Sequence, residues 1–174
     1  MNREVLYTPN SPWVYVVEAI ASDITNFGWS LANHQSSRVV VRFLRGRKMT
    51  NSSALDNEFA AALQFPWYFG ENWAAFDECI KDLEWMPGDV YVLIIIDSRA
   101  VLSEEPEEQF SILMRILQNA ANEWSQPVET SEAWSRPAVP FHVIFQCEGS
   151  DKQEVMGRLR SVGVTFEEMR ITNI

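Results

Sequence analysis

The run GDVYVLIIIDS, residues 88–98, constrains the fold more than any other stretch of this sequence. Val90 to Ile96 is apolar almost throughout and rich in β-branched residues. A run of that length and composition is typical of a strand covered on both faces, and such strands belong to parallel sheets. VVVRFLRG (39–46) and VPFHVIFQC (139–147) read as two further strands, the first ended by a glycine turn.

Helical patterns separate these strands. In NSSALDNEFAAAL (51–63), Ser53 and Asp56 have the spacing of a capping box. FSILMRILQNAANEW (110–124) is helical, and we expect Ser103 to cap that helix, with Glu104 to Glu108 compensated by the positive end of its dipole. The order strand–helix–helix–strand–helix–strand predicts an α/β fold with a small parallel β-sheet of strands near 39–45, 90–96 and 141–147.

The 174 residues fit one domain, with a core at 38–148 and terminal extensions at 1–37 and 149–174. The first extension contains the strand pattern WVYVVEAI, followed by a segment around Gly28 to which the pattern assigns no structure. The second contains the helical pattern KQEVMGRLRSV and then the strand pattern VTFEEMRI. We expect these flanks to add strands at the sheet edges.

Neither a membrane span nor a signal peptide is predicted. No run of about 18 uncharged apolar residues occurs, and MNREVLYTPNSPW has no apolar stretch of signal-peptide type. Cys79 and Cys147 fit a reducing compartment as buried thiols. We therefore expect a cytoplasmic protein that has no membrane partner.

The net charge of −10 is unevenly distributed. Residues 1–50 carry +3, residues 51–150 carry −13, and the remainder is neutral. An acidic middle disfavours binding to a phosphate backbone, so we expect no nucleic-acid partner. A basic protein partner, or a role in solubility alone, is the natural interpretation.

The acids concentrate in FPWYFGENWAAFDECIKDLEWM, residues 65–86. If Asn72 caps a helix there, two faces oppose each other. The apolar face comprises Trp73, Phe76, Ile80 and Leu83, and the other comprises Glu71, Ala74, Glu78, Asp82 and Trp85. Glu78 and Asp82 are like charges one turn apart, which is unfavourable by a few tenths of a kcal/mol, and Lys81 is the only base beside them. This arrangement suggests an external cation, although acidic faces often only contact water.

The loop before this helix is rich in aromatic residues. Trp67, Tyr68 and Phe69 cannot all be buried by so short a loop. They cover the sheet edge, or one or two of them form an exposed anchor for a protein partner. We expect Gly70 to supply a backbone conformation that other residues resist.

Other chemistries find less support. His34 and His142 stand alone, and no phosphate loop, HExxH motif or zinc-ligand spacing occurs. Acids on a convex helix lack the cleft that general acid–base catalysis needs. We expect no enzyme activity, no metal and no cofactor, and keep a carboxylate-dependent hydrolase as the least favoured hypothesis.

PWYFGENWAAFDECIKDL resembles the signature of the barstar family of bacterial ribonuclease inhibitors. FLRG and SSALDNEFAAALQFP upstream, and the strand–helix–strand order downstream, extend the resemblance to roughly residues 38–147. It implies a compact, non-catalytic inhibitor whose second helix and preceding loop block the active site of a basic ribonuclease toxin. The contacts it implies are Tyr68, Gly70, Asn72, Trp73, Ala74, Asp77 and Glu78. The acidic face adds Glu71 and Asp82.

The sequence departs from the family pattern at two of these positions. Ala74 stands where an acid is usual, and Asp77 stands where the best-known member has tryptophan. Glu78 occupies the position of that member's most important aspartate. The leading hypothesis is thus an inhibitor of a ribonuclease toxin, and the alternative is an immunity or binding module for another basic partner.

Overall fold

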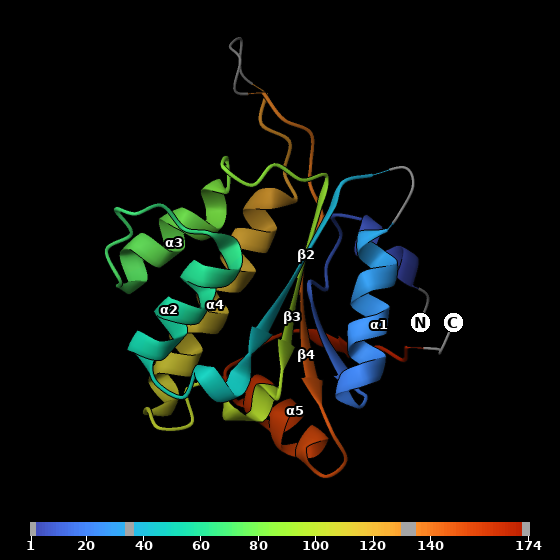
Figure 1. Cartoon of the computed structure of the whole chain (residues 1–174), viewed down its shortest axis with the longest axis vertical. Helices are drawn as coiled ribbons and strands as arrows, with labels where there is room; N and C mark the ends of the chain where they lie inside the picture. The colour runs from blue at the N-terminus through green and yellow to red at the C-terminus, as the bar shows by residue number, and fades with distance from the viewer. Residues whose placement is uncertain (1–2, 34–36, 130–134, 172–174) are drawn as a thin grey trace.

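A parallel sheet lies at the centre of the computed structural model, which describes residues 3–33, 37–129 and 135–171 (Figure 1). The described residues contain five strands in the order β2-β3-β4-β1-β5, and every neighbouring pair is parallel. The strands are β1 (Val14–Glu18), β2 (Val39–Arg45), β3 (Val90–Ile96), β4 (Phe141–Cys147) and β5 (Phe166–Glu168).

The three predicted core strands are confirmed, with the predicted bounds and direction. Val39 of β2 pairs with Val90 of β3, and Tyr91 of β3 pairs with Phe141 of β4. Every residue of β4, and all of β3 except Ile96, is buried. Layers of helices cover both faces of these strands, which is the reason their sequences are apolar without alternation.

The flanks add two strands, but only one of them lies at an edge. β5 is an edge strand, as predicted, whereas β1 is inserted between β4 and β5. Val14 to Val17 are all buried, so this run has the same continuous apolar character as the core strands. Both flanks thus extend the sheet beyond β4, and β5 forms its outer edge.

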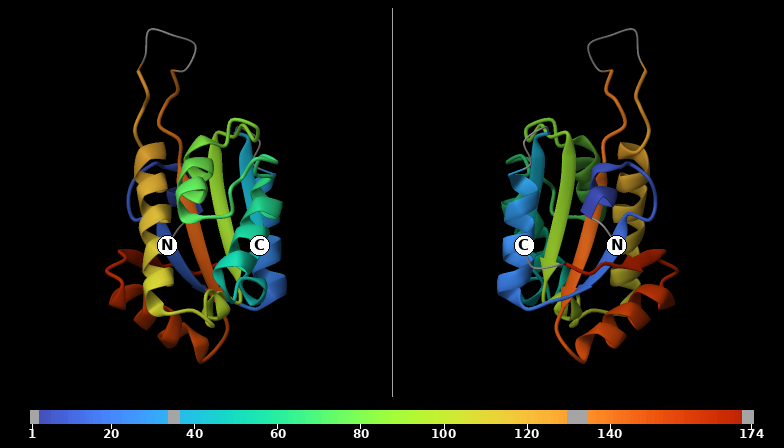
Figure 2. Two further views of the ribbon diagram at one scale, coloured as in Figure 1. Left: turned by 90° about the vertical axis from the view of Figure 1, so that its left-hand side faces the viewer. Right: turned by 90° about the vertical axis from the view of Figure 1, so that its right-hand side faces the viewer.

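Helices form a layer on each face of the sheet (Figure 1). α2 (Ser52–Leu63), α3 (Trp73–Asp82) and α4 (Glu107–Trp124) cover one face, and α3 lies between the other two (Figure 2). α1 (Ala21–Ala32) covers the opposite face. α5 (Asp151–Ser161) joins the core on the α2–α4 side. Short 3-10 turns, η1 (Arg3–Tyr7), η2 (Gly46–Lys48) and η3 (Ser98–Ala100), complete the described elements.

α1 is the element that the sequence pattern did not reveal. Gly28 lies inside this helix, where glycine is unfavourable by about 1 kcal/mol relative to alanine. A Cβ atom at this position would collide with the ring of Phe43 in β2. Close packing of the helix on the sheet therefore requires a residue that lowers the local helical signal.

Two predicted helix caps are corrected. Asn51, not Ser53, caps α2, because its side chain accepts a 3.0 Å hydrogen bond from the Ala54 amide. α4 begins at Glu107, directly after Pro106, and Ser103 lies too far upstream to cap it. Glu105 instead accepts hydrogen bonds from the backbone and hydroxyl of Ser52, and so ties the α4 approach to the start of α2.

No helix among the described residues combines the length and the apolar character required to cross a membrane.

Candidate protein-binding site

The loop before α3 presents two aromatic side chains to solvent and packs two others, which are partly buried, against the core. Phe65 and Phe69 pack edge to face, with ring centroids 5.0 Å apart, and contact the main core. The Phe69 amide donates to the Pro66 carbonyl and closes a tight turn. Trp67 is 95% exposed and Tyr68 is 64% exposed. Phe65 and Phe69 thus cover the core, whereas Trp67 and Tyr68 project outward.

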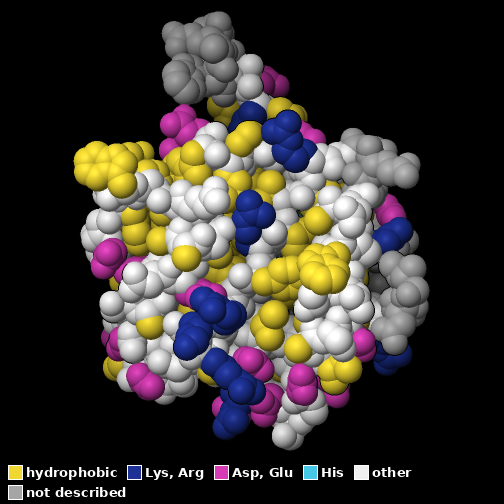
Figure 3. Space-filling model, in the orientation of Figure 1, with side chains coloured by type: hydrophobic (Ala, Val, Ile, Leu, Met, Phe, Trp, Pro, Cys, Tyr) yellow, Lys and Arg dark blue, Asp and Glu magenta, His cyan; other side chains and the backbone are white. Residues whose placement is uncertain are grey.

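This exposed aromatic patch is visible on the surface. Figure 3 shows hydrophobic side chains gathered at the upper left, over the loop that precedes α3. Lys and Arg side chains run instead down the middle of that view, over β2 and the turn after it. The basic side chains visible in this view therefore lie apart from the loop before α3.

Glu71, not Gly70, has the unusual backbone conformation in this loop. Glu71 has a φ of 46°, in the left-handed region, whereas Gly70 does not, so the prediction for Gly70 was wrong. Gly70 is needed for close approach, because a Cβ atom there would lie 2.9 Å from Asn72 Nδ2. That nitrogen donates to the Gly70 carbonyl at 2.9 Å.

Asn72 caps α3 as predicted. Its Oδ1 accepts a 3.0 Å hydrogen bond from the Ala75 amide, which satisfies one of the free donors at the helix start. Leu83 adopts the left-handed conformation and ends the helix at the other side. The exposed side chains between these two residues are therefore held on a short, well-defined helix.

The predicted division of α3 into two faces is present. Phe76 and Ile80 are fully buried, while Ala74, Glu78 and Asp82 are exposed. Among the described residues, no base lies within ion-pair distance of Glu78 or Asp82. These two carboxylates thus face solvent, one turn apart, without a described counter-ion.

Lys81, the only base beside Glu78 and Asp82 in the sequence of this helix, pairs with neither of them. Its Nζ lies 2.7 Å from Asp77 Oδ2 and 3.7 Å from Glu123 Oε2 on α4. Asp77 is therefore paired within the chain. Its charge is compensated where those of Glu78 and Asp82 are not.

Two tryptophans near α3 point into the structure. The Trp73 indole donates a 2.8 Å hydrogen bond to Gln109 on α4, and its ring packs edge to face on Phe76. Trp85 was expected on the acidic face, but it lies beyond the end of α3. Its indole donates to the Leu63 carbonyl at 2.9 Å. Both side chains fix α3 against its neighbours.

Asp56 of α2 lies near Glu71 of the loop before α3. The sequence pattern indicated only a capping-box role for it. It is only 6% exposed. Burial, together with the negative charge of Glu71, raises the pKa of Asp56 to about 6. An acid on the apolar side of a helix pattern, one position after Leu55, was the available signal. The proximity of Glu71 could not be read from the sequence.

The titratable groups around α3 do not form a catalytic arrangement. Burial raises the pKa of the Cys79 thiol, and Asp82 and Glu78 raise it further, so the thiol remains protonated. Across residues 3–33, 37–129 and 135–171, no three His, Cys, Asp or Glu side chains gather as a metal site would require. His34 lies outside these residues. His142 is buried, and its Nε2 lies 2.9 Å from the Thr8 carbonyl.

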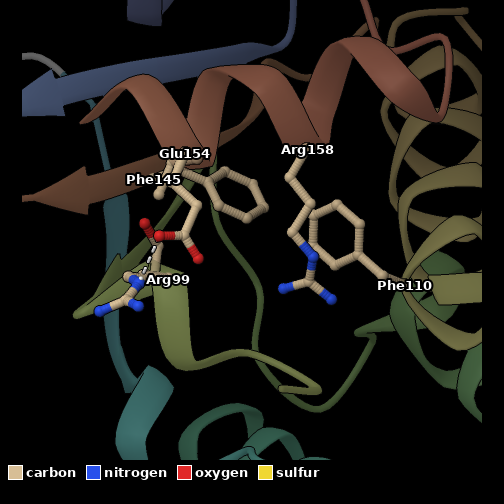
Figure 4. Close-up of a pocket in the computed structure, with 7 residues that line it drawn as sticks. Arg99, Phe110, Phe145, Glu154 and Arg158 are labelled. Carbon is tan, nitrogen blue, oxygen red and sulfur yellow. Dashed lines mark hydrogen bonds and ion pairs between the residues drawn. The ribbon is translucent and has the colours of Figure 1, made fainter. Parts of the chain in front are cut away.

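A small cavity between α4, α5 and η3 is also unsuited to a ligand. Figure 4 shows Arg158 over the ring of Phe110, and Arg99 bonded to Glu154. The cavity measures about 10 Å³, which is no more than the space one water molecule needs. Its residues instead attach α5 to the core.

The fold and its exposed features define a protein of the parallel α/β class with an acidic helix and an aromatic loop on its surface. The chain belongs to the barstar family: the family model described as Barstar (barnase inhibitor) matches residues 39–146. That range agrees closely with the predicted 38–147. The inhibitors of this family are not enzymes, which confirms the prediction that the chain does not catalyse a reaction.

No curated protein matches the chain significantly. Among solved structures, a chain in "Structure of Drosophila ORC bound to GC-rich DNA and Cdc6" is similar, with a TM-score of 0.52 and 13% identity. The match covers 98% of this chain and 52% of the other, so this chain spans about half the length of its structural neighbour. At that identity the likeness concerns the fold alone. A chain in "Structure of Drosophila ORC bound to AT-rich DNA and Cdc6" matches at 13% identity, with a TM-score of 0.48, over 92% of this chain and 50% of the other.

Proposed function

We propose that this chain inhibits a ribonuclease toxin by placing the acidic face of α3 and the preceding loop in the toxin's basic active site. The observation that carries this proposal is the pair Glu78 and Asp82, which are exposed one turn apart and have no counter-ion in the described part of the chain. Family membership supplies the class of partner.

The physical basis is charge complementarity. A ribonuclease active site binds phosphate with Lys, Arg and His side chains, and carboxylates at matching positions occupy the same site. Like charges on α3 repel each other in the free inhibitor. A basic partner removes this repulsion and therefore gains affinity from charges that are unfavourable in the free protein.

The proposed contact surface divides by exposure. Tyr68, Gly70, Glu71, Asn72, Ala74, Glu78 and Asp82 are exposed and would contact the partner directly. Trp73 and Asp77 have partners within the chain, so they would contribute chiefly by holding the surface in shape. Tyr68 is the aromatic anchor of this set, since a large rigid ring beside buried charges is typical of interface hot spots.

A second candidate function is immunity against a basic toxin that is not a ribonuclease. Two features favour it: Ala74 leaves a small side chain between Glu71 and Glu78, and Lys81 neutralises Asp77. Together they reduce the negative charge along the first half of α3. A target with fewer basic groups at that position would fit such a surface.

The inhibition of a barnase-type ribonuclease tests the leading proposal. Wild type should inhibit RNA cleavage at near-stoichiometric concentration, and Glu78→Ala should weaken inhibition at least tenfold. Glu148→Ala is the matched control, because Glu148 is an exposed acid that follows β4. Equal inhibition by wild type and Glu78→Ala would reject the α3 face as the binding site. No inhibition by either would favour the second candidate.

We also propose that residues 1–174 act as one domain, since β1 pairs with both β4 and β5 in a single sheet. Neutralising a toxin inside the cell that makes it requires a cytoplasmic inhibitor, and the free, buried thiols Cys79 and Cys147 suit that compartment.

A further inference from the structure

A groove of about 490 Å³ lies beyond the C-terminal end of α3. The loop at residues 83–89 forms one wall, and the end of α4 together with residues 136–139 forms the other. Residues 125–129 and 135–139 extend from the top of the molecule (Figure 1), joined by reciprocal hydrogen bonds between Val128 and Arg136. Asp82 lines the groove and also ends the acidic face of α3, so the two surfaces are continuous.

Buried aromatic rings lie beneath the groove, since Tyr91 is 2% exposed and Trp124 is 6% exposed. The rings of Tyr91 and Trp124 pack at a centroid distance of 5.2 Å. The Tyr91 hydroxyl donates to the Met86 carbonyl, and the Val139 amide donates to the Trp124 carbonyl, both at 2.8 Å. The polar groups of these floor residues are thereby satisfied. Pro87, Pro137 and Ala138 supply the accessible apolar surface of the groove, which suits a long aliphatic stem.

The two cations that line the groove are bound within the chain. The Arg136 guanidinium lies 4.4 Å from the centre of the Trp124 ring and donates to the carbonyls of Glu123, Trp124, Gln126 and Pro137. Lys81 is bound to Asp77 and Glu123. Neither cation is free to receive an anion.

The rim is acidic. Asp82, Glu84, Asp89 and Glu123 line the groove, so four carboxylates face two bases. Asp89 accepts a hydrogen bond from the Arg38 amide. The groove also lies at the C-terminal ends of α3 and α4, where the helix dipoles favour positive charge. An apolar floor below an acidic rim fits a side chain with an apolar stem and a cationic head.

We propose that this groove takes a lysine or arginine side chain from a loop of the protein partner that lies outside the partner's own active site. The inference rests on the proposed function, because it extends the α3 surface toward the same basic partner. This second contact area would determine which of several basic toxins is bound tightly, because it binds a side chain of the toxin that the toxin's catalysis does not require.

Other occupants fit less well. The rim carboxylates repel phosphate, which argues against nucleic acid and anionic lipid headgroups. A protein held on α3 is brought to the groove at Asp82 without a further loss of translational freedom. The groove therefore suits a side contact of a bound protein.

The first test uses octa-arginine and backbone amide NMR. Addition of the peptide to wild type should shift the amides of Leu83 and Val139 and the indole signal of Trp124. Glu84→Lys should reduce these shifts severalfold, whereas Glu148→Lys, the same charge change at the far end of β4, should leave them unchanged. Ala138→Phe fills the groove without a change of charge and should also reduce them. Unmoved groove signals in wild type would overturn the inference, whatever the ribonuclease result.

The second test measures dissociation from a barnase-type ribonuclease. Glu84→Lys and Ala138→Phe should each accelerate dissociation by about fivefold or more, a change of the size found for well-packed interface residues, while Glu148→Lys should not. Unchanged rates for both groove variants in a tight complex would refute the groove contact and leave the α3 proposal intact. If wild type binds octa-arginine in the groove but not the ribonuclease, the proposed target is wrong and the groove stands.

Discussion

Lys81 lies one helical turn after Asp77, with its Nζ 2.7 Å from Asp77 Oδ2, and reaches on to Glu123 of α4. One base thus neutralises the acid that faces α4 and leaves Glu78 and Asp82 uncompensated. Acid before base at this spacing is the favourable orientation for a helical ion pair.

Lys81→Met should accelerate association with a basic ribonuclease, because it exposes two carboxylates and makes the surface more negative. The gain should shrink as salt rises, since exposed charges are screened. Unfolding free energy should fall by only about 0.3–0.5 kcal/mol, the usual value of such a pair. Association rates at two salt concentrations measure the effect. Lys152→Met is the control, because Lys152 pairs with Glu18 and Glu168 away from α3. An equal gain in both variants would show that only net charge matters.

Glu78→Ala and Asp82→Ala should differ in which rate they change. Glu78 lies near the middle of the proposed surface, so its loss should raise the dissociation rate and cost about 2–5 kcal/mol, a range that comes from complexes of this family rather than from the present geometry. Asp82 lies at the end of α3 and should mainly affect the association rate at low salt. Surface binding kinetics separate the two effects. A dissociation rate that Glu78→Ala leaves unchanged would contradict a central role for this carboxylate.

Ala74→Asp should tighten binding to a barnase-type ribonuclease. Ala74 is exposed in the first turn of α3, so a carboxylate there adds negative charge to the surface proposed to bind a basic active site. The helix dipole stabilises that carboxylate by about 0.3–1 kcal/mol, although Glu78 opposes it one turn later. The equilibrium dissociation constant is the readout, and Ala61→Asp on the exposed side of α2 is the control. Weaker binding after Ala74→Asp would indicate a target that differs from the usual one and would favour the second candidate function.

Asp56→Asn should stabilise the protein at neutral pH. Because burial and Glu71 raise the pKa of Asp56 from 3.8 to about 6, the folded state holds a proton that the unfolded state releases between these values. The shift corresponds to about 3 kcal/mol, which solvent screening reduces. Stability contributed at this site therefore falls as pH rises from about 4 to about 6, by on the order of 2 kcal/mol. Urea unfolding of wild type and variant at pH 4.5 and 7 gives the difference. Glu71→Gln should give a smaller gain of the same sign. A pH-independent difference for Asp56→Asn would show that the carboxyl titrates normally.

His142 should produce the opposite slope. Burial lowers its pKa from 6.5 to about 4, and the bond to the Thr8 carbonyl only partly opposes this. The unfolded state then takes up a proton that the folded state refuses, so stability is lost as pH falls from 6.5 to about 4, by on the order of 3 kcal/mol. His142→Gln removes this proton uptake, and the unfolding free energy of wild type relative to the variant should decline over that range. A constant difference would contradict the buried neutral form.

The sequence revealed those features that local patterns determine. Val90 to Ile96 is apolar because both faces of β3 are covered, and Asn72 caps α3 through a bond to Ala75, only three residues away. The strand patterns at 13–20 and 164–171 were also recognised. Their order in the sheet was not, because the pairing of β1 with β4 joins residues far apart in the chain.

The errors at the candidate site have the same origin. Lys81 is the only base beside Glu78 and Asp82 in the sequence, but it pairs with Asp77 and with Glu123 of α4. The turn before α3 uses Glu71 for its left-handed conformation, although Gly70 beside it is the residue that adopts this conformation most readily. Asp56 was interpreted as a cap, since only the folded chain brings Glu71 near it.

The position of β1 has a consequence for the growing chain on the ribosome. Among the five described strands β1 is made first, whereas its native neighbours β4 and β5 are made last. The buried residues Val14 to Val17 therefore have no native strand to pair with until β4 has been made. Contacts so distant in sequence close slowly. A nascent chain of this protein therefore carries an unpaired apolar strand while β2, β3 and the helices between them are made, and its dependence on chaperones should be set by that delay.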